Sequence, residues 1–248
     1  MELVERFTRT WTAEASAAGG ELLPSLLAQA AARVLSVDGA GLSLMSGPGL
    51  RLPLGSSDDD AETAERLQFT IGEGPCFEAH QGGRPVIVTP GKLRERWPAL
   101  AEQHLTRTPF RAGLSTPLRQ GAERFGALDV YLRKPQAPQG HDIIAAQLIA
   151  EVVAGVLLET LDAGNDGDPS NPLGAAPVAW LDSPAIHRRR DVWVAVGMAN
   201  LTLRLSSDDA LATLRAHAYA GGQTLDEFAQ EVVEGRFDLE GLRSDVET

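Results

Sequence analysis

Reactive and metal-binding residues are scarce in this chain of 248 residues. Cys76 is the single cysteine, which excludes an intrachain disulfide and a zinc site built on cysteines. The five histidines are scattered without metal-ligand spacing: His80, His104, His141, His187 and His217. We therefore expect no structural or catalytic metal.

Targeting and membrane-spanning signals are also lacking. No basic start is followed by an apolar core and a small-residue cleavage site, so we expect no secretion. The most apolar run, residues 143–161, contains Gln147, Glu151 and Glu159, which argues against a membrane span. These absences predict a cytoplasmic protein without a membrane partner.

Positive charge is in the minority, because 22 lysine and arginine residues face 34 acidic ones and the net charge is −12. Such a chain does not attract polyanions through its overall field, so any binding of nucleic acid must come from a local patch. Residues 186–248 hold seven arginines and eleven acidic residues, which argues against strong nonspecific binding there.

What the chain does contain divides it into two domains. A hydrophobic content of 43% and a charged content of 23% fit a soluble globular protein. Residues 162–177 are rich in Gly, Pro, Asn and Asp, which supply turns and little apolar surface, so they indicate a linker. We predict a first domain over residues 1–161, a linker over 162–182 and a second domain over 183–242.

The first domain alternates between helical and strand patterns. We expect helices over residues 22–35, 60–68 and 142–161, and a weaker one over 93–105, where Pro98 opposes it. Strands are expected over residues 42–45 and 50–54 around a turn at 46–49, over 86–88, and over 113–118 and 125–132 across Gln120-Gly121. This order predicts an α+β domain with a mainly antiparallel central sheet flanked by helices.

The second domain carries three sets of helix-start signals. Ser183-Pro184 is an N-cap before a proline at the first helical position, Ser206 precedes an acidic first turn, and Thr224 to Glu227 is a capping box. Gly221-Gly222 and Gly235 end the second and third helices. We predict an all-α three-helix bundle with a core of Val196, Leu201, Leu211, Leu214, Ala218, Phe228, Ala229 and Val232.

The segment Ile71-Gly72-Glu73-Gly74-Pro75-Cys76-Phe77 is glycine-rich but lacks the spacing and lysine of a phosphate-binding loop. We expect it to shape a turn at the mouth of a pocket. With the order of elements, it resembles the G-E-G-P-C segment in GAF domains of actinobacterial GAF–ANTAR proteins. The resemblance implies a sensor domain with an unidentified small ligand in a pocket on one sheet face. The candidate pocket residues are Gly72, Glu73, Cys76 and Phe77.

Cys76 has two interpretations. If Pro75 starts a helix, Cys76 lies one turn before His80, and a Cys–His pair can hold a reactive thiolate. No acid or amide partner is identifiable, and a free cysteine is more commonly a small buried hydrophobe. We favour the hydrophobe, keep redox sensing as the alternative, and expect no enzyme activity.

Three spaced patterns in the second domain resemble an ANTAR domain. They are Val192-x-x-Ala195-x-Gly197-Met198, Ala210-x-x-x-Leu214-Arg215-x-x-Ala218 and Leu225-x-x-Phe228-Ala229-x-x-Val232-Val233. Members of that family are RNA-binding output modules of transcription antitermination regulators. The resemblance implies that hairpins in nascent transcripts are the partner, and that the sensor domain controls their binding.

Candidate RNA-binding residues combine positive charge, aromatic faces and motif positions. Guanidinium groups pair with phosphates and stack on unstacked bases. The competing interpretation is a solvated helical face with ion pairs to Asp182 or Asp191. The candidates are Arg188, Arg189, Arg190, Trp193, Ala195, Gly197, Arg215 and Tyr219.

The second domain departs from the ANTAR pattern just before Ala195. That family usually carries polar residues such as His and Gln before the motif, and often Lys within it, where this chain has Trp193, Val194 and Val196. Trp193 either stacks on a base or packs into the bundle or a domain interface, and we favour packing. The alternative function is therefore a protein-interaction module whose ANTAR-like domain has lost its RNA contacts.

Two helical faces carry more apolar residues than one sheet face covers. One face joins Val4, Phe7 and Trp11, and the other runs along residues 142–161. A symmetric dimer could bury both in a helical bundle and bring two C-terminal domains to one axis, as paired RNA hairpins require. We therefore expect a homodimer.

Overall fold

Five antiparallel strands form the centre of the N-terminal part of the protein, in the order β2-β1-β5-β4-β3. The computed structural model describes residues 2–15, 20–45, 51–165 and 179–242. The strands are β1 (Gly39–Met45), β2 (Arg51–Ser56), β3 (Val86–Val88), β4 (Ala112–Gln120) and β5 (Glu123–Leu132). The predicted hairpin is present, because Gly121 (φ 59°) lies in the turn that joins β4 to β5. Residues 46–50, where a turn was expected, lie outside the described part.

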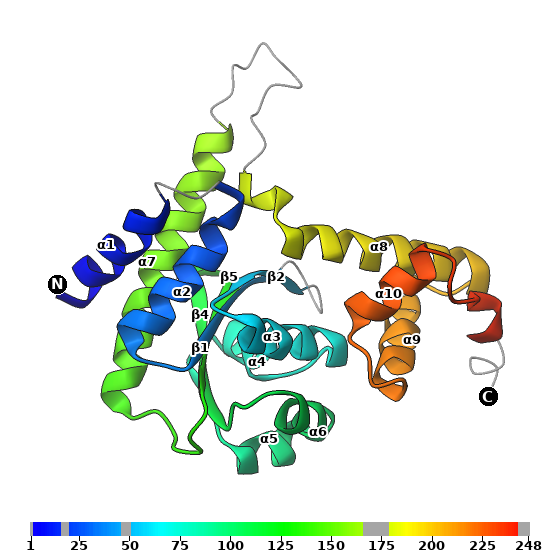
Figure 1. The fold of residues 1–248 in the computed structure, drawn as a ribbon, viewed down its shortest axis with the longest axis horizontal. Coiled ribbons are helices and arrows are strands. Elements are labelled where there is room, and N and C mark those ends of the chain that lie inside the picture. Colours follow the sequence, from blue (N-terminus) through cyan, green and yellow to red (C-terminus); the bar gives the residue numbers. More distant parts are fainter. Residues whose placement is uncertain (1, 16–19, 46–50, 166–178, 243–248) are drawn as a thin grey trace.

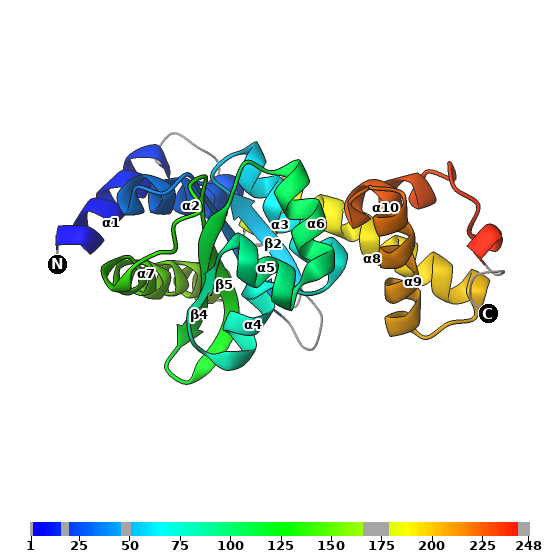
Figure 2. The same ribbon diagram turned by 90° about the horizontal axis from the view of Figure 1, so that it is seen from below.

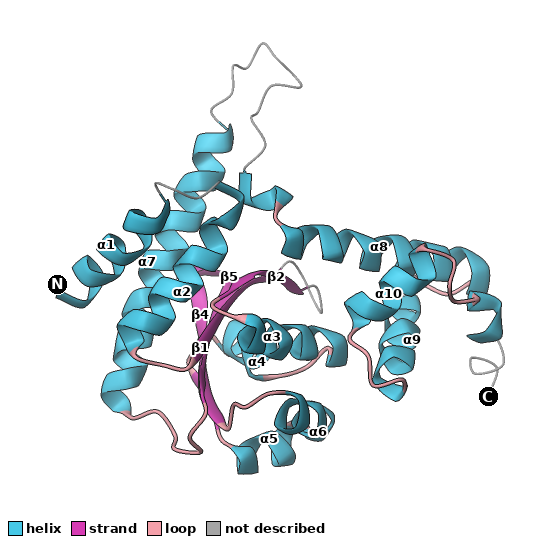
Figure 3. Ribbon diagram, in the orientation of Figure 1, coloured by secondary structure: helices cyan, strands magenta, loops and turns pink. Residues whose placement is uncertain are grey.

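Helices cover both faces of this sheet (Figure 1), and Figure 3 shows the sheet between them. On one face lie α1 (Glu2–Ala15), α2 (Leu23–Leu35) and α7 (Gly140–Asn165). On the other lie α3 (Asp59–Ile71), α4 (Pro75–Gly82), α5 (Pro90–Arg96) and α6 (Pro98–Arg107). The strands are therefore buried on both sides, and nearly every residue of β1 is inaccessible. We call these elements, residues 2–165, the sensor domain, after the role that the resemblance implies.

Two helices differ from the sequence prediction. The weak helix expected over residues 93–105 is two helices, because Pro98 begins α6 instead of interrupting one long helix. Proline is favoured in the first helical turn, where its missing N–H costs nothing. Helix α7 ends at Asn165, four residues beyond the expected end at 161. Residues 166–178 of the expected linker lie outside the described part.

The apolar faces of α1 and α7 are covered to different extents. Phe7 is fully buried, whereas Val4 and Trp11 are half-buried, with Trp11 packed against the same core. Residues Gly140–Thr160 of α7 have a mean hydropathy of 1.8, and by length and composition alone could cross a bilayer. One face of this helix packs into the sheet core, whereas Ile144 and Leu148 remain 61% and 42% exposed.

The C-terminal part forms the predicted three helices, α8 (Pro184–Leu203), α9 (Ser207–Ala220) and α10 (Leu225–Val233), here called the C-terminal bundle. All three predicted caps are present. The side chains of Ser183 and Ser206 accept hydrogen bonds from backbone amides in the first turns of α8 and α9. Thr224 and Glu227 form a complete capping box at α10.

The prediction is wrong for one core residue of the bundle. Leu201 is 81% exposed, whereas the other predicted core residues are buried. The buried face of α8 follows Val192, Ala195, Val196 and Ala199, at the i, i+3, i+4, i+7 spacing of one helical face. Leu201 lies off that face, so helix geometry directs it to solvent.

The bundle is joined to the sensor domain at two places. Trp180, in the short 3-10 helix Ala179–Asp182, is buried in the sheet core and donates a hydrogen bond from Nε1 to Thr160 Oγ1 at 2.9 Å. Beyond it, the bundle lies against α3 and α6, as Figures 1 and 2 show from two directions. Helix α3 therefore lies between the sheet and the bundle.

Candidate functional site

The inner face of α3, which is directed at the sheet, holds a buried ion pair. Arg51 of β2 forms a salt bridge with Glu65 of α3 and donates from Nη1 to the Glu65 carbonyl oxygen at 2.7 Å. A second carboxylate, Asp129 of β5, lies 3.4 Å from Arg51 Nη2. All three residues are 1% exposed. One cation thus faces two acids in a space without water access.

Neutral donors complete the inner cluster. Gln68 donates from Nε2 to Asp129 Oδ2 at 2.9 Å, and the Tyr131 hydroxyl donates to Glu65 Oε1 at 2.5 Å. Ser115 donates to the other oxygen of Asp129. Every member of this group is therefore held by at least one other member, as a stable buried polar network requires. We call it the inner cluster: Arg51, Glu65, Gln68, Ser115, Asp129 and Tyr131.

Burial sets the protonation of this cluster. Burial and the neighbouring Glu65 raise the pKa of Asp129 well above its ordinary range, although Arg51 opposes the shift. Burial also raises the pKa of Tyr131. A protonated Asp129 leaves Arg51 and Glu65 as one neutral ion pair, which is the cheapest charge state for a buried site.

The space between the sheet and α3–α6 is nearly filled. A cavity of about 20 Å³ remains there, lined by Gln68, His104, Asp129 and Tyr131 among others. This volume holds about one water molecule, whereas small-molecule pockets span roughly 300–1,000 Å³. In this conformation the space beside the inner cluster therefore has no room for a small ligand.

The segment from Gly72 to Phe77 connects this cluster with the C-terminal bundle. Gly72 (φ 81°) ends α3, and a β-carbon there would lie 2.8 Å from Arg215 Nη1 of the bundle. Gly74 (φ 145°) allows Gln68 to approach, since a β-carbon there would lie 2.7 Å from Gln68 Oε1. Gln68 Oε1 then accepts from the Cys76 amide at 3.2 Å. The expected turn thus lies at the edge of the buried space.

The remaining candidate pocket residues lie around this turn. Cys76 is fully buried in an apolar group with Met45, Phe77 and Ala127, and burial raises the pKa of its thiol well above the usual value. This environment favours the uncharged thiol over a thiolate. Glu73 lies at the surface of the turn and is half-buried.

The outer face of α3 contacts the bundle through a stacked arginine. The Arg189 guanidinium of α8 lies over the Phe69 ring, 3.3 Å from its centroid, and Arg189 Nη1 lies 3.0 Å from Asp226 Oδ1 of α10. Arg189 is only 3% exposed. Burial lowers its pKa to about 9, and the attraction of Asp226 only partly offsets this. The Arg215 guanidinium lies 5.3 Å from the same ring.

Hydrogen bonds extend this contact along α3. Arg66 pairs from Nε with Asp226 Oδ2 at 3.1 Å and donates from Nη2 to Thr224 Oγ1 at 2.6 Å. The backbone amide of Leu225 donates to Thr70 Oγ1 at 2.8 Å. The start of α10 is therefore fixed to two side chains of α3.

Carboxylates at the rim of the contact face the bundle. Glu62 of α3 forms a salt bridge with Arg188, and Glu102 of α6 accepts a hydrogen bond from the Tyr219 hydroxyl at 2.6 Å. Arg107 of α6 donates to the Gly222 carbonyl oxygen at 3.1 Å. Four of the eight candidate RNA-binding residues, Arg188, Arg189, Arg215 and Tyr219, thus meet the sensor domain.

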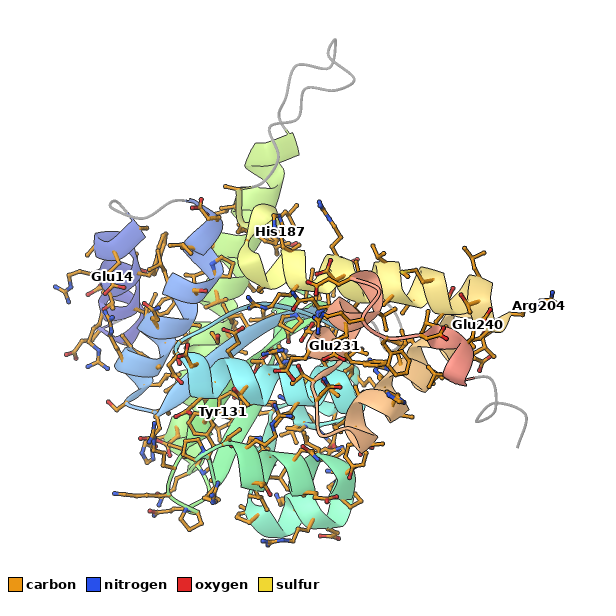
Figure 4. All side chains as sticks on the ribbon, turned by 45° about the vertical axis from the view of Figure 1, so that its right-hand side comes forward. Glu14, Tyr131, His187, Arg204, Glu231 and Glu240 are labelled. Carbon is orange, nitrogen blue, oxygen red and sulfur yellow. The ribbon has the colours of Figure 1, made fainter. Side chains whose placement is uncertain are left out.

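The other four candidates do not join them. Ala195 is buried in the bundle core and Trp193 packs against that core. Arg190 and Gly197 are exposed on α8. Figure 4 shows α8 from its start near His187 to Arg204 at its outer end, with Tyr131 inside the sensor domain. The eight candidates therefore form no single surface.

Sequence reasoning missed the inner cluster and the sensor side of the contact. Asp129 gave one signal, since an acid inside the apolar strand run Ala127-Leu128-Asp129-Val130 requires a buried partner. Glu65 and Arg51 gave none, because charged residues on an expected helix and strand are ordinarily solvated. Phe69 was an unremarkable aromatic on a helix.

A larger cavity, of about 200 Å³, lies where the sensor domain meets the bundle. Residues of α2, β2, α3, α8 and α10 line it, including Ser25, Glu62, Arg66, Arg188 and Asp226. Its acidic and basic groups are mixed, so it shows no preference for one sign of charge.

Comparison with known families identifies the N-terminal part. The GAF domain family matches residues 20–157, and the chain belongs to that family. The match spans the sheet and the helices α2 to α7 that hold the inner cluster. GAF domains are sensor domains of signalling proteins, so the chain has the fold of a signal-sensing protein.

Solved structures with this fold are distant from the chain. The GAF domain of a phosphoenolpyruvate-protein phosphotransferase from Coxiella burnetii has 16% identity and a TM-score of 0.49, covering 66% of this chain and 96% of that one. The GAF domain of a putative sensor histidine kinase from Pseudomonas syringae pv. tomato has 22% identity and a TM-score of 0.41, covering 64% and 90%. No curated protein matches the chain.

Proposed function

We propose that the protein is a signal-responsive regulator of transcription antitermination, in which the GAF sensor domain controls RNA binding by an ANTAR-like bundle. An unidentified small ligand, a redox event or a partner changes the sensor domain, and the bundle then binds hairpins in nascent RNA. The chemistry is binding, not catalysis, and the protein acts in the cytoplasm.

The observation that carries this proposal is the contact between α3 and the bundle. The sensor helix that holds the inner cluster also holds Arg188 and Arg189, two side chains suited to RNA phosphates and bases. A signal can act only through different affinities for two states. A contact between the sensing element and the candidate RNA-binding side chains supplies such a pair of states, docked and undocked.

Hairpin selection tests the RNA-binding step. RNA hairpins selected against the full chain at low salt should bind with an affinity that falls as salt rises. Replacing Arg188, Arg189 and Arg190 by Ala should weaken binding about tenfold or more, because guanidinium contacts are lost.

A control with the same charge change replaces the exposed sensor arginines Arg94, Arg119 and Arg133 by Ala. It should alter affinity far less, because those residues lie outside the bundle. Absence of binding to any selected hairpin, in any ligand state, would remove the antitermination proposal.

A protein-interaction module is the second candidate. It is favoured by the four candidate residues that contact the sensor domain and by the packing of Trp193 against the bundle core. An interaction module should co-purify with a defined protein partner and retain no hairpin after RNA selection. Enriched hairpins without such a partner would exclude it.

Self-association through α7 is part of the proposal. The exposed Ile144 and Leu148 lie one helical turn apart on the face of α7 that is turned away from the sheet core, and a second copy is the occupant that matches their apolar character. Val152 and Val156 are half-buried against the chain's own core, so Ile144 and Leu148 are the safer sites to change.

Replacing Ile144 and Leu148 by Glu should convert a dimer into a folded monomer in light scattering at tens of micromolar concentration. Val194→Glu with Leu201→Glu, at exposed positions of α8, makes the same change of apolar residue to acid away from α7 and should leave the dimer intact. A wild-type monomer would contradict this assembly.

A further inference from the structure

We propose that the α3–α6 face of the sensor domain imitates RNA, so that the docked sensor domain and an RNA hairpin compete for the same side chains of the bundle. The inference rests on the proposed function and adds the mode of its regulation. The competing surface on the sensor side consists of Glu62, Phe69 and Glu102, here called the mimic surface.

Phe69 takes the place that an unstacked base would take. Arginine stacks its planar guanidinium on exposed bases in RNA complexes, and aromatic rings offer the same flat π-face. Arg189 lies 3.3 Å from the Phe69 ring centroid and is 3% exposed, so no base can reach that face of its guanidinium while the bundle is docked. Arg215 lies near the same ring, which extends the blocked region to α9.

Glu62 and Glu102 take the place of phosphates. Glu62 pairs with Arg188, and Glu102 accepts from the Tyr219 hydroxyl, and both are contacts that a phosphate oxygen also makes. The sensor domain therefore offers negative oxygens and a flat ring together, which are the two features that RNA loops offer. Charge complementarity of this kind favours one specific docked arrangement.

The docked contact is suited to reversal. Arg189 and Asp226 are each 3% exposed in their side chains, and burial lowers the pKa of Arg189 to about 9, so the lost hydration is only partly replaced. Opening rehydrates Arg189, Asp226 and Arg66 at once. A polar contact inside one chain resembles a transient interface more than a core. RNA that supplies phosphates and bases can therefore displace it.

The sensor signal has a direct path to this surface. Helix α3 carries Glu65 and Gln68 on its inner face and Glu62 and Phe69 on its outer face, spaced so that one rigid helix displays both sets. A ligand that separates Glu65 from Arg51 by moving α3 also moves Glu62 and Phe69, because all three residues belong to this helix. That shift changes the mimic surface and with it the fraction of bundle free to bind RNA.

The test changes only the sensor domain in the full chain. Glu62→Gln with Glu102→Gln removes both carboxylates of the mimic surface and leaves every residue of the bundle intact. The matched control is Glu95→Gln with Glu123→Gln, two exposed glutamates elsewhere on the sensor domain with the same charge change. Hairpins are selected in parallel with the wild type and the Glu62/Glu102 variant, and the tightest hairpin is titrated against all three proteins.

The Glu62/Glu102 variant should bind this hairpin at least about tenfold more tightly than the wild type, with the control unchanged. Hydrogen exchange reports docking independently of RNA, because the Leu225 amide is held by Thr70 only while the bundle is docked. Its exchange should be faster in the variant, and adding the hairpin to the wild type should also accelerate it.

Other outcomes separate the two claims. Equal affinities in the wild type and variant, with faster Leu225 exchange in the variant, would overturn the competition and leave RNA binding standing. No hairpin bound by any of the proteins would overturn the proposed function and the competition together.

If the Gln pair leaves Leu225 exchange unchanged, Glu62→Arg with Glu102→Arg forces opening by repulsion of Arg188. Affinity equal to that of the Glu95→Arg, Glu123→Arg control then overturns the inference.

Discussion

Both faces of α3 hold buried charged groups, but the groups on the two faces differ in the number of their partners. On the inner face, Arg51, Glu65 and Asp129 are enclosed by the sheet, and each charge has several partners. On the outer face, Arg189 is just as buried, but Asp226 is its only ion-pair partner among the described residues and is shared with Arg66. Water reaches the charged groups of the inner face only when the domain unfolds or when a ligand opens the cluster. It reaches those of the outer face when the bundle moves away from α3.

This difference teaches how one helix can join a stable core to a reversible contact. Burial of charges costs several kcal/mol per ion unless partners replace water, and in the inner cluster the charged groups have such partners, with Arg51 Nε as the exception. The outer contact has the less complete network and is therefore the one expected to open first. The following predictions test that division, from the largest expected effect to the smallest.

Replacing one arginine on each face of α3 by alanine should give the largest difference in the free energy of unfolding. Arg51→Ala leaves Glu65 and Asp129 facing each other without a cation, and should lower the free energy of unfolding by about 3–5 kcal/mol. Arg66→Ala on the outer face should cost about 1 kcal/mol, because Asp226 retains Arg189 and the 20%-exposed site admits water. Urea unfolding of both variants measures the difference. Equal losses would show that the two faces are energetically alike.

Acid should weaken the inner side of the domain through His104. This residue of α6 lines the small cavity beside Tyr131, and burial, then Arg111, lower its pKa to about 4. Below about pH 6.5 His104 is protonated in the unfolded chain but stays neutral in the folded chain. The free energy of unfolding therefore decreases as the pH falls from about 6.5 towards 4.

Between pH 7 and pH 5 the protonation of His104 on unfolding should lower the free energy of unfolding of the wild type by about 2 kcal/mol. The His104→Gln variant should lack this contribution. The carboxylates titrate in both proteins, so the difference between the two pH profiles isolates His104. Parallel profiles would contradict a neutral buried histidine at this position.

The last prediction concerns Cys76. Cys76→Ser places a hydroxyl in an apolar group and should lower the free energy of unfolding by about 1–2 kcal/mol. Cys76→Ala keeps the site apolar and serves as the control. Mild peroxide should leave the RNA affinity of the wild type unchanged, because burial favours the thiol form. A peroxide response that Cys76→Ser abolishes would restore redox sensing.

Local signals in the sequence predicted most of the fold. The β4–β5 hairpin, the caps at Ser183 and Ser206 and the capping box at Thr224 depend on neighbouring residues, so they could be inferred without the tertiary structure. Leu201 failed because apolar character was weighed above helical spacing. Pro98 was taken as a helix breaker where it starts a helix.

The polar sites could not be predicted in the same way. Arg51, Glu65 and Asp129 come from three elements separated by up to 78 positions in the sequence, and nothing in their local spacing indicates that they meet. The docking of Arg189 on Phe69 is equally nonlocal. Family resemblance drew attention to the arginines of α8 but gave no sign that the chain itself covers them.

Two backbone amides allow the most direct test of the division between the faces of α3. Gln68 on the inner face accepts from the Cys76 amide, and Thr70 on the outer face accepts from the Leu225 amide. Native-state hydrogen exchange in increasing denaturant should show Leu225 exchanging through a local opening of lower free energy that is nearly independent of denaturant. Cys76 should exchange only with global unfolding. The same opening free energy and denaturant dependence for both amides would contradict the account.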